Sequence, residues 1–226
     1  MSDASHRQIR FHKPPGATEV FLVRHGESEP AVDGKPFPLV DGHGDPALAP
    51  EGLVHADQVG ERLADEGIDA VYVTTLRRTA QTAAPLLARI GLEARVEADL
   101  REVSLGEWDG GQYRKHARAG HPLIIQMMQE ERWDVIPGAE PMEVFAERVA
   151  AGLARIVAAH ADQRVAVFTH GGVIGEAMRL AVGGTRPFAF IGADNGSISH
   201  LVAIGDRWIV RRYNDTAHLA PGYDRE

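Results

Sequence analysis

The chain has 226 residues, of which 44% are hydrophobic and 25% are charged, and it contains no cysteine. This balance is typical of a globular protein with one domain of about 200 residues or with two small ones. The lack of thiols excludes disulfides, a cysteine nucleophile and cysteine-bound zinc. The formal net charge of −8 argues against broad nucleic-acid binding, which depends on Lys and Arg side chains that neutralise phosphates. We therefore expect a small ligand and no nucleic-acid partner.

Residues 1–18 are expected to form a loose N-terminal arm. They lack the apolar h-region of a secretion signal, and no apolar run in the chain approaches the roughly 20 residues that span a bilayer. The sequence therefore predicts a cytoplasmic protein that does not associate with membranes.

Strand and helix patterns alternate along the rest of the chain. Residues 20–23 predict a buried strand, and residues 30–50, which are rich in Gly and Pro, predict an irregular loop. Apolar residues at helical spacing predict a helix that begins at Pro50 and ends near Gly67. The later expected elements are strands at 69–74, 92–96 and 164–168, helices at 76–90, after Pro141 and at 172–182, and an antiparallel hairpin at 197–214 around Gly205 and Asp206.

This alternation favours a single α/β domain over residues 1–226. We expect a three-layer sandwich, in which a mostly parallel central sheet carries helices on both faces. The C-terminal antiparallel hairpin would complete the sheet.

Two of the predicted apolar strands run directly into a histidine that is followed by glycine. These histidines are His25 and His170. Ligands of open α/β sheets collect beyond the carboxyl ends of the strands, so both imidazoles are expected in one crevice. Either histidine alone is more often a structural residue than a catalyst. The pair together strengthens the catalytic interpretation.

Three arginines are expected close to these histidines. Arg24 precedes His25, and Arg77 and Arg78 lie in the first turn of the helix predicted at 76–90. Cations are unfavourable at a helix N-terminus, which already carries partial positive charge. A bound phosphate would relieve this conflict and match the fork of guanidinium donors, whereas one of the two adjacent arginines is expected to point into solvent.

A carboxyl group is needed if this crevice cleaves phosphate esters, because the departing alkoxide must be protonated at neutral pH. Glu102 is the best candidate, because it follows a short predicted strand and precedes a glycine-rich turn. Glu27 and Glu107 are the alternatives. Each of the three would otherwise be an ordinary surface charge.

Taken together, these residues resemble the histidine phosphatase superfamily, also called phosphoglycerate-mutase-like, over roughly residues 19–219. The resemblance selects Arg78 rather than Arg77 in the helix motif. The segments similar to family motifs are Arg24-His25-Gly26-Glu27, Leu76 to Thr82, Leu100-Arg101-Glu102 ahead of Gly106 to Gly110, and His170-Gly171-Gly172.

The resemblance implies a mechanism for hydrolysis of a small phosphorylated substrate. His25 would attack phosphorus to form a phosphohistidine, which water would then hydrolyse. Arg24, Arg78 and His170 would clamp the transferring oxygens, and the backbone at Gly171 would add donors at a helix start. Glu102 would protonate the leaving oxygen and later accept a proton from water. The mechanism implied in this way needs no metal and no other cofactor.

Two departures from the family pattern favour a phosphatase over a cofactor-dependent phosphoglycerate mutase. The mutases carry Trp-Asn soon after the first motif, where this chain has Ser28 to Ala31. Their Arg-Arg-Ser-Tyr-type segment is also missing after Trp108, and residues 114–121, RKHARAGH, are only a loose substitute. A noncatalytic phospho-ligand sensor or scaffold is a further alternative, although the full set of motif residues argues against it. Specificity is expected to depend on the insertion at 109–140 and on the loop at 30–50.

Other patterns have weaker functional interpretations. Asp41, His43 and Asp45 in DGHGD suggest a metal site, but no recognised ligand spacing supports one, and a flexible polar loop is the default. Trp108 and Trp133 would stack on an aromatic substrate or pack in a core or lid. Residues 114–121 would bind an acidic partner, form a solvated helix face or edge the substrate pocket. The sequence allows a homodimer without predicting one.

Overall fold

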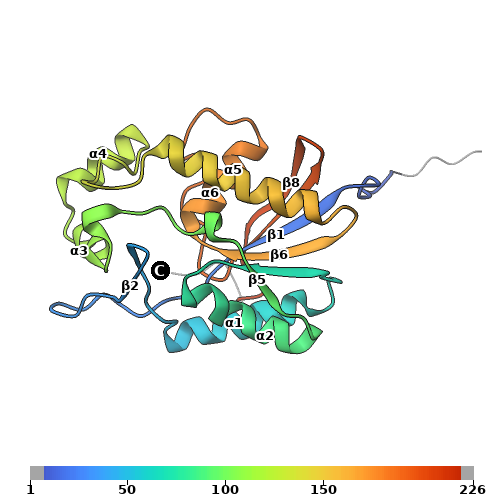
Figure 1. Ribbon diagram of the computed structural model, residues 1–226, viewed down its shortest axis with the longest axis horizontal. Helices are drawn as coiled ribbons and strands as arrows, with labels where there is room; N and C mark the ends of the chain where they lie inside the picture. Colours follow the sequence, from blue (N-terminus) through green and yellow to red (C-terminus); the bar gives the residue numbers. More distant parts are fainter. Residues whose placement is uncertain (1–7, 220–226) are drawn as a thin grey trace, which may run out of the picture.

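The computed structural model describes residues 8–219, and a six-stranded sheet lies at its centre (Figure 1). Four parallel strands lie side by side in the order β5 (Ala94–Val96), β4 (Ala70–Val73), β6 (Arg164–Thr169) and β1 (Thr18–Arg24). The hairpin of β7 (Ile198–Ile204) and β8 (Arg207–Asp215) continues the sheet, with β7 antiparallel to β1. The predicted mostly parallel sheet with a C-terminal antiparallel hairpin is confirmed.

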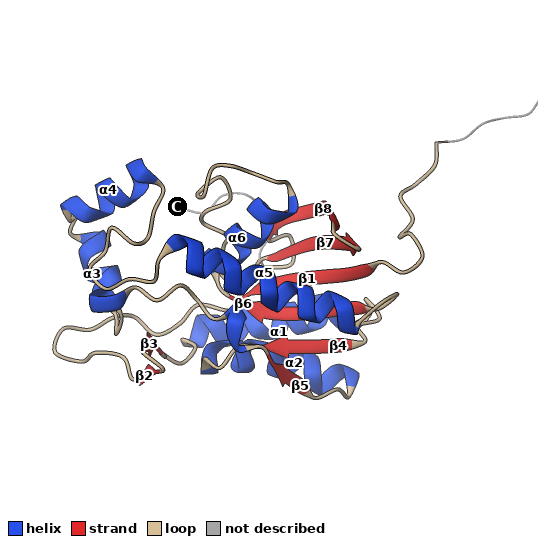
Figure 2. Ribbon diagram, turned by 45° about the horizontal axis from the view of Figure 1, so that its top comes forward, coloured by secondary structure: helices blue, strands red, loops and turns tan. Residues whose placement is uncertain are grey.

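Alternate residues of β1 pack on opposite faces of the sheet. Val20 and Leu22 belong to the core under α5 (Met142–Ala159) and α6 (Gly171–Ala181), whereas Phe21 and Val23 belong to the core over α1 (Pro50–Ala64) and α2 (Arg77–Ile90). Figures 1 and 2 show the two helix pairs on either side of the sheet. A parallel strand that is buried on both faces needs a continuous apolar run, because each buried Val, Leu or Phe contributes about 1.5–3 kcal/mol. The three predicted layers are confirmed.

The helix boundaries follow local signals. Helix α1 begins with Pro50 at its first turn, where a missing N–H costs nothing, and it has Ala49 as an N-cap without a side-chain hydrogen bond. Helix α2 ends at Gly91, which adopts the left-handed φ of 69°. None of the helices within residues 8–219 is both long and apolar enough to cross a membrane.

The loop at 30–50 is more ordered than predicted. It contains a short hairpin of β2 (Leu39–Val40) and β3 (His43–Gly44), joined by Asp41 at φ 48° and Gly42 at φ 82°. Two consecutive residues with positive φ form the tight turn that suits a hairpin, and Asp-Gly is its usual sequence signal. That signal was present in the sequence, but strands of only two residues give no recognisable alternation.

The insertion at 109–140 folds as two short helices beyond the carboxyl ends of the parallel strands (Figure 1). They are α3 (Gln112–Arg118) and α4 (Pro122–Glu130), preceded by the 3₁₀ turns η1 (Ala98–Leu100) and η2 (Gly106–Trp108). A separate apolar cluster holds them together; its buried members are Trp108, Met127, Ile136, Met142 and Phe188. The insertion is therefore packed against the domain through a small apolar cluster that both share.

The predicted N-terminal arm at 1–18 includes residues that contact the rest of the protein. Residues 1–7 lie outside the described residues, and Thr18 is the first residue of β1. Ala17 is buried, and Gly16 N and Lys13 Nζ both donate hydrogen bonds to Asp162, each at 2.6 Å. The chain is thus attached to the domain before the first strand begins.

Candidate active site

The register of β1 and β6 brings the two predicted histidines together. Arg24 pairs with Thr169 across the parallel strands. His25 and His170, which directly follow these two residues, therefore lie at the same height along the sheet. Their ring centroids lie 5.2 Å apart at an interplanar angle of 62°, and both side chains are buried. The structure therefore places both imidazoles in one crevice at the carboxyl end of the sheet.

His25 is oriented by its own backbone neighbour. Its Nδ1 lies 2.7 Å from Gly26 O, and since a carbonyl oxygen only accepts, Nδ1 carries the proton and Nε2 presents a lone pair. Burial holds the pKa of His25 well below its usual range, and the positive charges of Arg78 and Arg24 lower it further. Gly26 admits no side chain, because a Cβ would overlap Gly52 O. His25 is thus a fixed, neutral imidazole, which is the form that a nucleophile needs.

His170 is held through the opposite ring nitrogen. Its Nε2 lies 3.0 Å from Thr74 Oγ1, at the end of β4, whereas its buried Nδ1 has no hydrogen-bond partner among residues 8–219. Burial, followed by Arg78 and His25, holds the pKa of His170 well below its usual range. The second histidine is therefore also neutral when no ligand is bound.

Arg78 is buried and Arg24 is half-buried beside the histidines. Arg24 Nη1 donates to Ala193 O, while its buried Nε has no partner in the described part of the chain. Arg78 Nη1 donates to Gly44 O at 2.9 Å and lies 4.0 Å from Asp45 Oδ1. Burial lowers the pKa of both arginines, in Arg78 to about 10. Such groups are suited to an anion that would restore the lost solvation.

The neighbouring Arg77 has a structural role instead. Its backbone N donates to Asp45 Oδ1 at 2.9 Å and its Nε donates to Asp45 O at 2.8 Å. Its side chain is 45% exposed, against 8% for Arg78. The prediction that only one of the two adjacent arginines faces the crevice agrees with this geometry.

Glu102 lies against the start of α6. Its Oε2 accepts a hydrogen bond of 3.2 Å from Gly172 N, and its Oε1 accepts one of 3.1 Å from Val103 N. A Cβ on Gly172 would overlap Glu102 Oε1, so glycine at this position leaves room for the carboxylate in its observed place. The alternatives are differently placed: Glu27 is exposed at the rim of the pocket, and Glu107 is exposed in η2. Of the three glutamates, Glu102 is the one beside the second histidine motif.

The family profile described as histidine phosphatase superfamily (branch 1) matches residues 20–216. The chain belongs to this superfamily. Phosphoglycerate mutase-like protein 4 of Arabidopsis thaliana is 33% identical over 205 residues, which cover 89% of this chain and 86% of that protein. The resemblance inferred from the motifs is confirmed, and so is the prediction of an enzyme of this superfamily.

Solved structures of the superfamily have the same architecture. A mycobacterial glucosyl-3-phosphoglycerate phosphatase is 26% identical and superimposes with a TM-score of 0.72 over 88% of this chain and 100% of its own. A phosphoglycerate mutase from Bacillus anthracis str. Sterne, 19% identical, superimposes with a TM-score of 0.73 over 91% of this chain and 96% of its own. The second likeness concerns the fold alone.

Sequence reasoning missed the residue that holds the Glu102 segment in this histidine phosphatase. Arg148 of α5 donates hydrogen bonds of 2.6–2.9 Å to the carbonyls of Asp99, Arg101 and Glu102. On its other side, the guanidinium donates from Nε to Glu140 Oε1 at 2.6 Å and from Nη2 to Glu140 Oε2 at 2.8 Å. Arginine on a long helix gives no signal that it will cap carbonyls some 45 residues earlier, so only the fold reveals this role.

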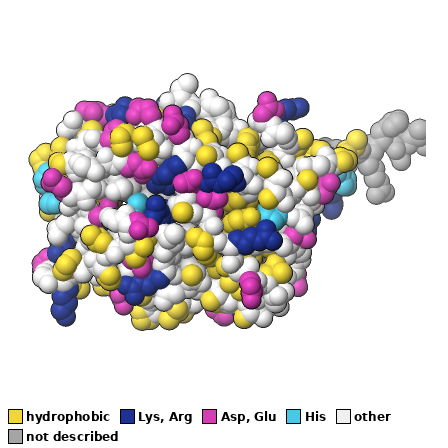
Figure 3. All heavy atoms as spheres, viewed as in Figure 1, with side chains coloured by type: hydrophobic (Ala, Val, Ile, Leu, Met, Phe, Trp, Pro, Cys, Tyr) yellow, Lys and Arg dark blue, Asp and Glu magenta, His cyan; other side chains and the backbone are white. Residues whose placement is uncertain are grey.

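Part of the segment 114–121 lies at an edge of the site, which is one of the interpretations that the sequence offered. Arg114, Lys115 and Arg118 line a pocket of about 410 Å³ together with Arg24 and His25, and we call this pocket the mouth of the site. Of the interpretations offered for this segment, an edge of the substrate pocket fits best. Basic side chains elsewhere form no broad band on the face drawn in Figure 3, where Lys and Arg are mixed with Asp and Glu.

The suggested metal site in DGHGD does not form. Asp41 pairs with Arg101 at 2.6 Å, and Asp45 pairs with Arg77 and Arg78. Within the described range 8–219, no three His, Asp or Glu side chains are grouped so that they could hold a metal ion. The carboxylates of this motif instead anchor arginines around the site.

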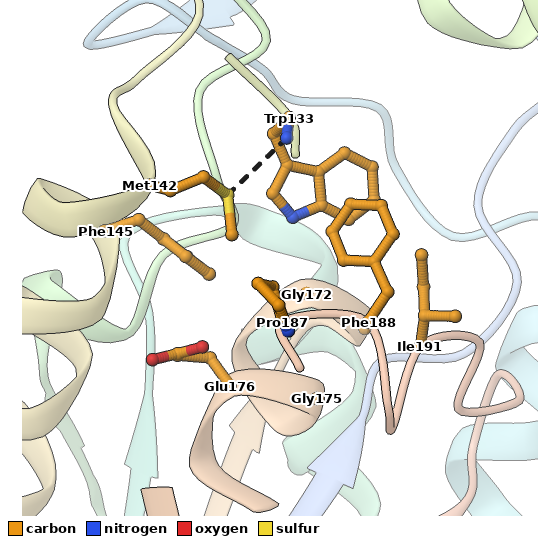
Figure 4. Close-up of a pocket in the computed structure, with 10 residues that line it drawn as sticks. Trp133, Met142, Phe145, Gly172, Gly175, Glu176, Pro187, Phe188 and Ile191 are labelled. Atoms are coloured by element: carbon orange, nitrogen blue, oxygen red, sulfur yellow. Dashed lines mark hydrogen bonds between the residues drawn. The ribbon is translucent and has the colours of Figure 1, made fainter. Parts of the chain in front are cut away.

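The two tryptophans pack inside the insertion. Trp108 is buried and stacks on His116 at 4.4 Å, and Trp133 lies 4.8 Å from Phe188. Figure 4 shows Trp133 and Phe188 over a small pocket, with Met142 Sδ accepting a 3.5 Å hydrogen bond from Trp133 N. Glu176, at the bottom of this pocket, is paired with Arg179 at 2.5 Å. Packing of the insertion, rather than a stacking platform, accounts for both tryptophans.

Proposed function

We propose that the protein is a metal-independent phosphomonoester hydrolase that acts through a phosphohistidine on His25. The observation that carries the proposal is the orientation of His25, whose Nδ1 is bonded to Gly26 O and whose Nε2 is left as a lone pair among Arg24, Arg78 and His170. The relative from mycobacteria is named as a phosphatase of a phosphorylated small molecule, which supports this substrate class.

The first step transfers the phosphoryl group to the enzyme. His25 Nε2 attacks phosphorus and forms a P–N bond while the P–O bond to the alcohol breaks. Protonated Glu102 gives its proton to the departing oxygen, so that a neutral alcohol leaves. Arg24, Arg78 and His170, with the backbone at Gly171, hold the three equatorial oxygens while charge spreads over them.

The second step returns His25 to its starting state. Water attacks the phosphohistidine and gives one proton to the Glu102 carboxylate as the P–N bond breaks. Inorganic phosphate then leaves, with His25 neutral and Glu102 protonated again. The hydrogen bond from Gly172 N to Glu102 Oε2 supports this role, because it keeps the carboxyl group at the start of α6.

The proposal is tested with p-nitrophenyl phosphate, with and without a chelator. We expect turnover that is insensitive to the chelator and a phosphoenzyme that is labile in acid but stable in alkali, so that a rapid quench in alkaline denaturant can trap it. His25→Ala is expected to lose both. If His25→Ala kept wild-type turnover, or if no phosphoenzyme could be trapped, the mechanism would be wrong. A protein with no turnover at all would favour the noncatalytic sensor.

A phosphoglycerate mutase is the second candidate, and Arg114, Lys115 and Arg118 at the mouth are the observation that favours it. A mutase must retain its phosphohistidine for return transfer, which calls for additional anion contacts. Arg114 already donates hydrogen bonds to Ser28 Oγ and Glu29 O, both at 2.7 Å, so fewer of its donors are available for a second phosphate. We therefore favour the phosphatase over the mutase. Robust isomerisation of 3-phosphoglycerate in the presence of 2,3-bisphosphoglycerate would reverse this order. A cytoplasmic location and a homodimer stay predictions.

A further inference from the structure

His43 is fixed beside the site by a firmly anchored hairpin. Gly44 N donates to Asp109 Oδ1 at 2.9 Å, and Gly44 O accepts from Arg78 Nη1 at 2.9 Å. At the turn, Asp41 pairs with Arg101 at 2.6 Å. The hairpin is thus bonded to three separate segments, and the position of His43 is determined before any ligand arrives.

The His43 ring has one nitrogen in use and one unused. Nδ1 lies 3.0 Å from Asp41 O and must donate to it, because a carbonyl has no proton to give. In the neutral ring, which carries a single proton, Nε2 is therefore a hydrogen-bond acceptor. His43 is only 8% exposed, and its Nε2 has no partner within the described chain. An unpaired buried polar atom is unfavourable and rare, so this one calls for a donor from outside the protein.

The pocket that contains His43 lies on the Glu102 side of the site. It has a volume of about 110 Å³, and its lining includes His43, Arg78 and Glu102 together with the aromatic Trp108 and Tyr113. The general acid protonates the oxygen that leaves with the alcohol, so the alcohol portion of the substrate belongs on this side. The larger mouth, with Arg24 and His25, lies beside it.

The chemistry of Nε2 selects which part of a substrate it contacts. Phosphoryl oxygens of a dianion only accept hydrogen bonds, so they do not pair with a lone pair on nitrogen. A hydroxyl group donates, and it is the common donor on the alcohol portion of a phosphate ester. The neighbouring Arg78, whose guanidinium only donates, is the group suited to the phosphoryl oxygens.

We propose that His43 Nε2 accepts a hydrogen bond from a hydroxyl group of the substrate's alcohol portion, so that the enzyme prefers phosphate esters of polyols and sugars. This inference rests on the proposed function, because it places the leaving alcohol beside Glu102. It assigns a substrate-binding role to the histidine of DGHGD, and the residue takes no part in bond breaking.

A matched pair of esters tests the proposal. Glycerol 3-phosphate and n-propyl phosphate have the same three-carbon ester, but only the first carries hydroxyl groups. Wild-type protein is expected to favour glycerol 3-phosphate in kcat/KM. In His43→Ala this preference should fall at least about tenfold, because the hydroxyl loses its acceptor, while n-propyl phosphate changes less than about threefold. His43→Gln, whose amide oxygen also accepts, should recover part of the preference.

Val40→Ala is the control for the hairpin, since Val40 pairs directly with His43 across β2 and β3. It should keep the wild-type preference, and melting temperatures of all variants show whether each one folds. Equal losses on both esters with weaker inhibition by inorganic phosphate would mean that His43 holds the phosphoryl group, and the proposal would be wrong. An unchanged preference in His43→Ala would also overturn it.

The proposed function and this inference fail separately. If wild-type protein hydrolyses neither p-nitrophenyl phosphate nor either of these esters, the hydrolase proposal fails. Calorimetric binding of the two esters to His25→Ala and to His25→Ala/His43→Ala then still decides whether His43 recognises the hydroxyl groups. Tighter binding of glycerol 3-phosphate that disappears with His43 supports the inference, and equal binding of both esters contradicts it.

Discussion

The floor of the site and the cap over it are held in place in different ways. The floor consists of Arg24, His25, Arg78, Glu102 and His170, which lie at strand ends or just beyond them and are fixed by the sheet and by buried hydrogen bonds. The cap consists of α3, α4 and the β2–β3 hairpin, which rest on a separate apolar cluster and on ion pairs.

This difference suggests that the floor determines the rate of phosphoryl transfer, whereas the cap determines which substrates are preferred. A change in the floor alters the groups that would meet the phosphoryl oxygens of every substrate, so it should lower kcat whatever the alcohol is. A change in the cap alters contacts with the rest of the substrate, so it should appear in KM or in the ratio between substrates. The predictions below would break or sharpen this division.

The largest effect is expected from Arg78→Ala. Under the proposed mechanism Arg78 holds the transferring oxygens, so loss of its buried guanidinium should lower kcat about 10³-fold, equivalent to about 4 kcal/mol. Arg77→Ala is the matched control, because Arg77 is the next residue in the same helix turn and is bonded to Asp45 instead. Steady-state kinetics on p-nitrophenyl phosphate measure both. Equal losses in the two variants would show that the turn, and not the Arg78 guanidinium, is what matters.

Glu102→Gln should slow hydrolysis about 10²-fold for alkyl phosphates, whose alcohols are poor leaving groups. For p-nitrophenyl phosphate the loss in the first step should be much smaller, since p-nitrophenolate leaves without protonation. Burst kinetics across a series of leaving groups separate the two steps. The same loss in phosphoryl transfer for every leaving group would remove Glu102 as the general acid.

The buried histidines of the floor should make folding sensitive to mild acid. The pKa of His25 and that of His170 are both held well below the ordinary value by burial. As the pH falls below about 6.5, the unfolded chain binds protons that the folded chain does not, so the free energy of unfolding decreases by up to about 1.4 kcal/mol per pH unit for each histidine. Stability is retained at higher pH and lost through this window.

Urea denaturation at pH 7.5 and pH 5.5 measures this loss. The lowered pKa values of His200 and His218 act in the same direction, so the difference between wild type and His170→Asn isolates one histidine of the floor. The variant should lose less stability between the two pH values. An identical loss in both proteins would mean that His170 takes up its proton in the folded state.

The smallest effect is expected in the cap. Arg114→Ala should raise KM about tenfold for a substrate with a second anionic group and leave kcat within about threefold, because Arg114 lines the mouth and its hydrogen bonds go to Ser28 and Glu29 instead of to a floor residue. Arg89→Ala, which removes an exposed arginine paired with Asp57 on the far helices, is the control. A fall in kcat comparable with that of Arg78→Ala would abolish the distinction between floor and cap.

The floor could be predicted from sequence because its residues lie at fixed distances from strand ends. The local pattern is an apolar run that ends in a histidine, and it occurs before His25, together with Arg24, and again before His170. Parallel strands end at the same edge of a sheet, so this pattern alone is enough to bring the two histidines together. The choice of Arg78 over Arg77 depended on the family motif. The positions of these side chains in the structure agree with both lines of reasoning, while their catalytic roles stay predictions.

The cap could not be predicted in the same way, because long-range side-chain contacts determine it. The Asp41-Gly42 turn was visible, but nothing in the sequence says that Arg78 and Asp109 hold the strand after it. Arg148 reaches three carbonyls from a helix far along the chain. The direction of a long side chain depends on the fold as a whole, so these contacts become apparent only in three dimensions.

The loss of solvation at two arginines of the floor bears on how the stability of this enzyme can be changed. Arg78 is buried and Arg24 is half-buried, burial lowers the pKa of both, and Arg24 Nε has no partner in residues 8–219. We expect uncharged substitutions at either position to raise the melting temperature while turnover is lost, which is a trade-off between stability and activity. Selection for a high melting temperature alone would therefore favour inactive variants. An anionic ligand present throughout the selection would prevent this, because it compensates the charge of the two arginines and stabilises the active protein.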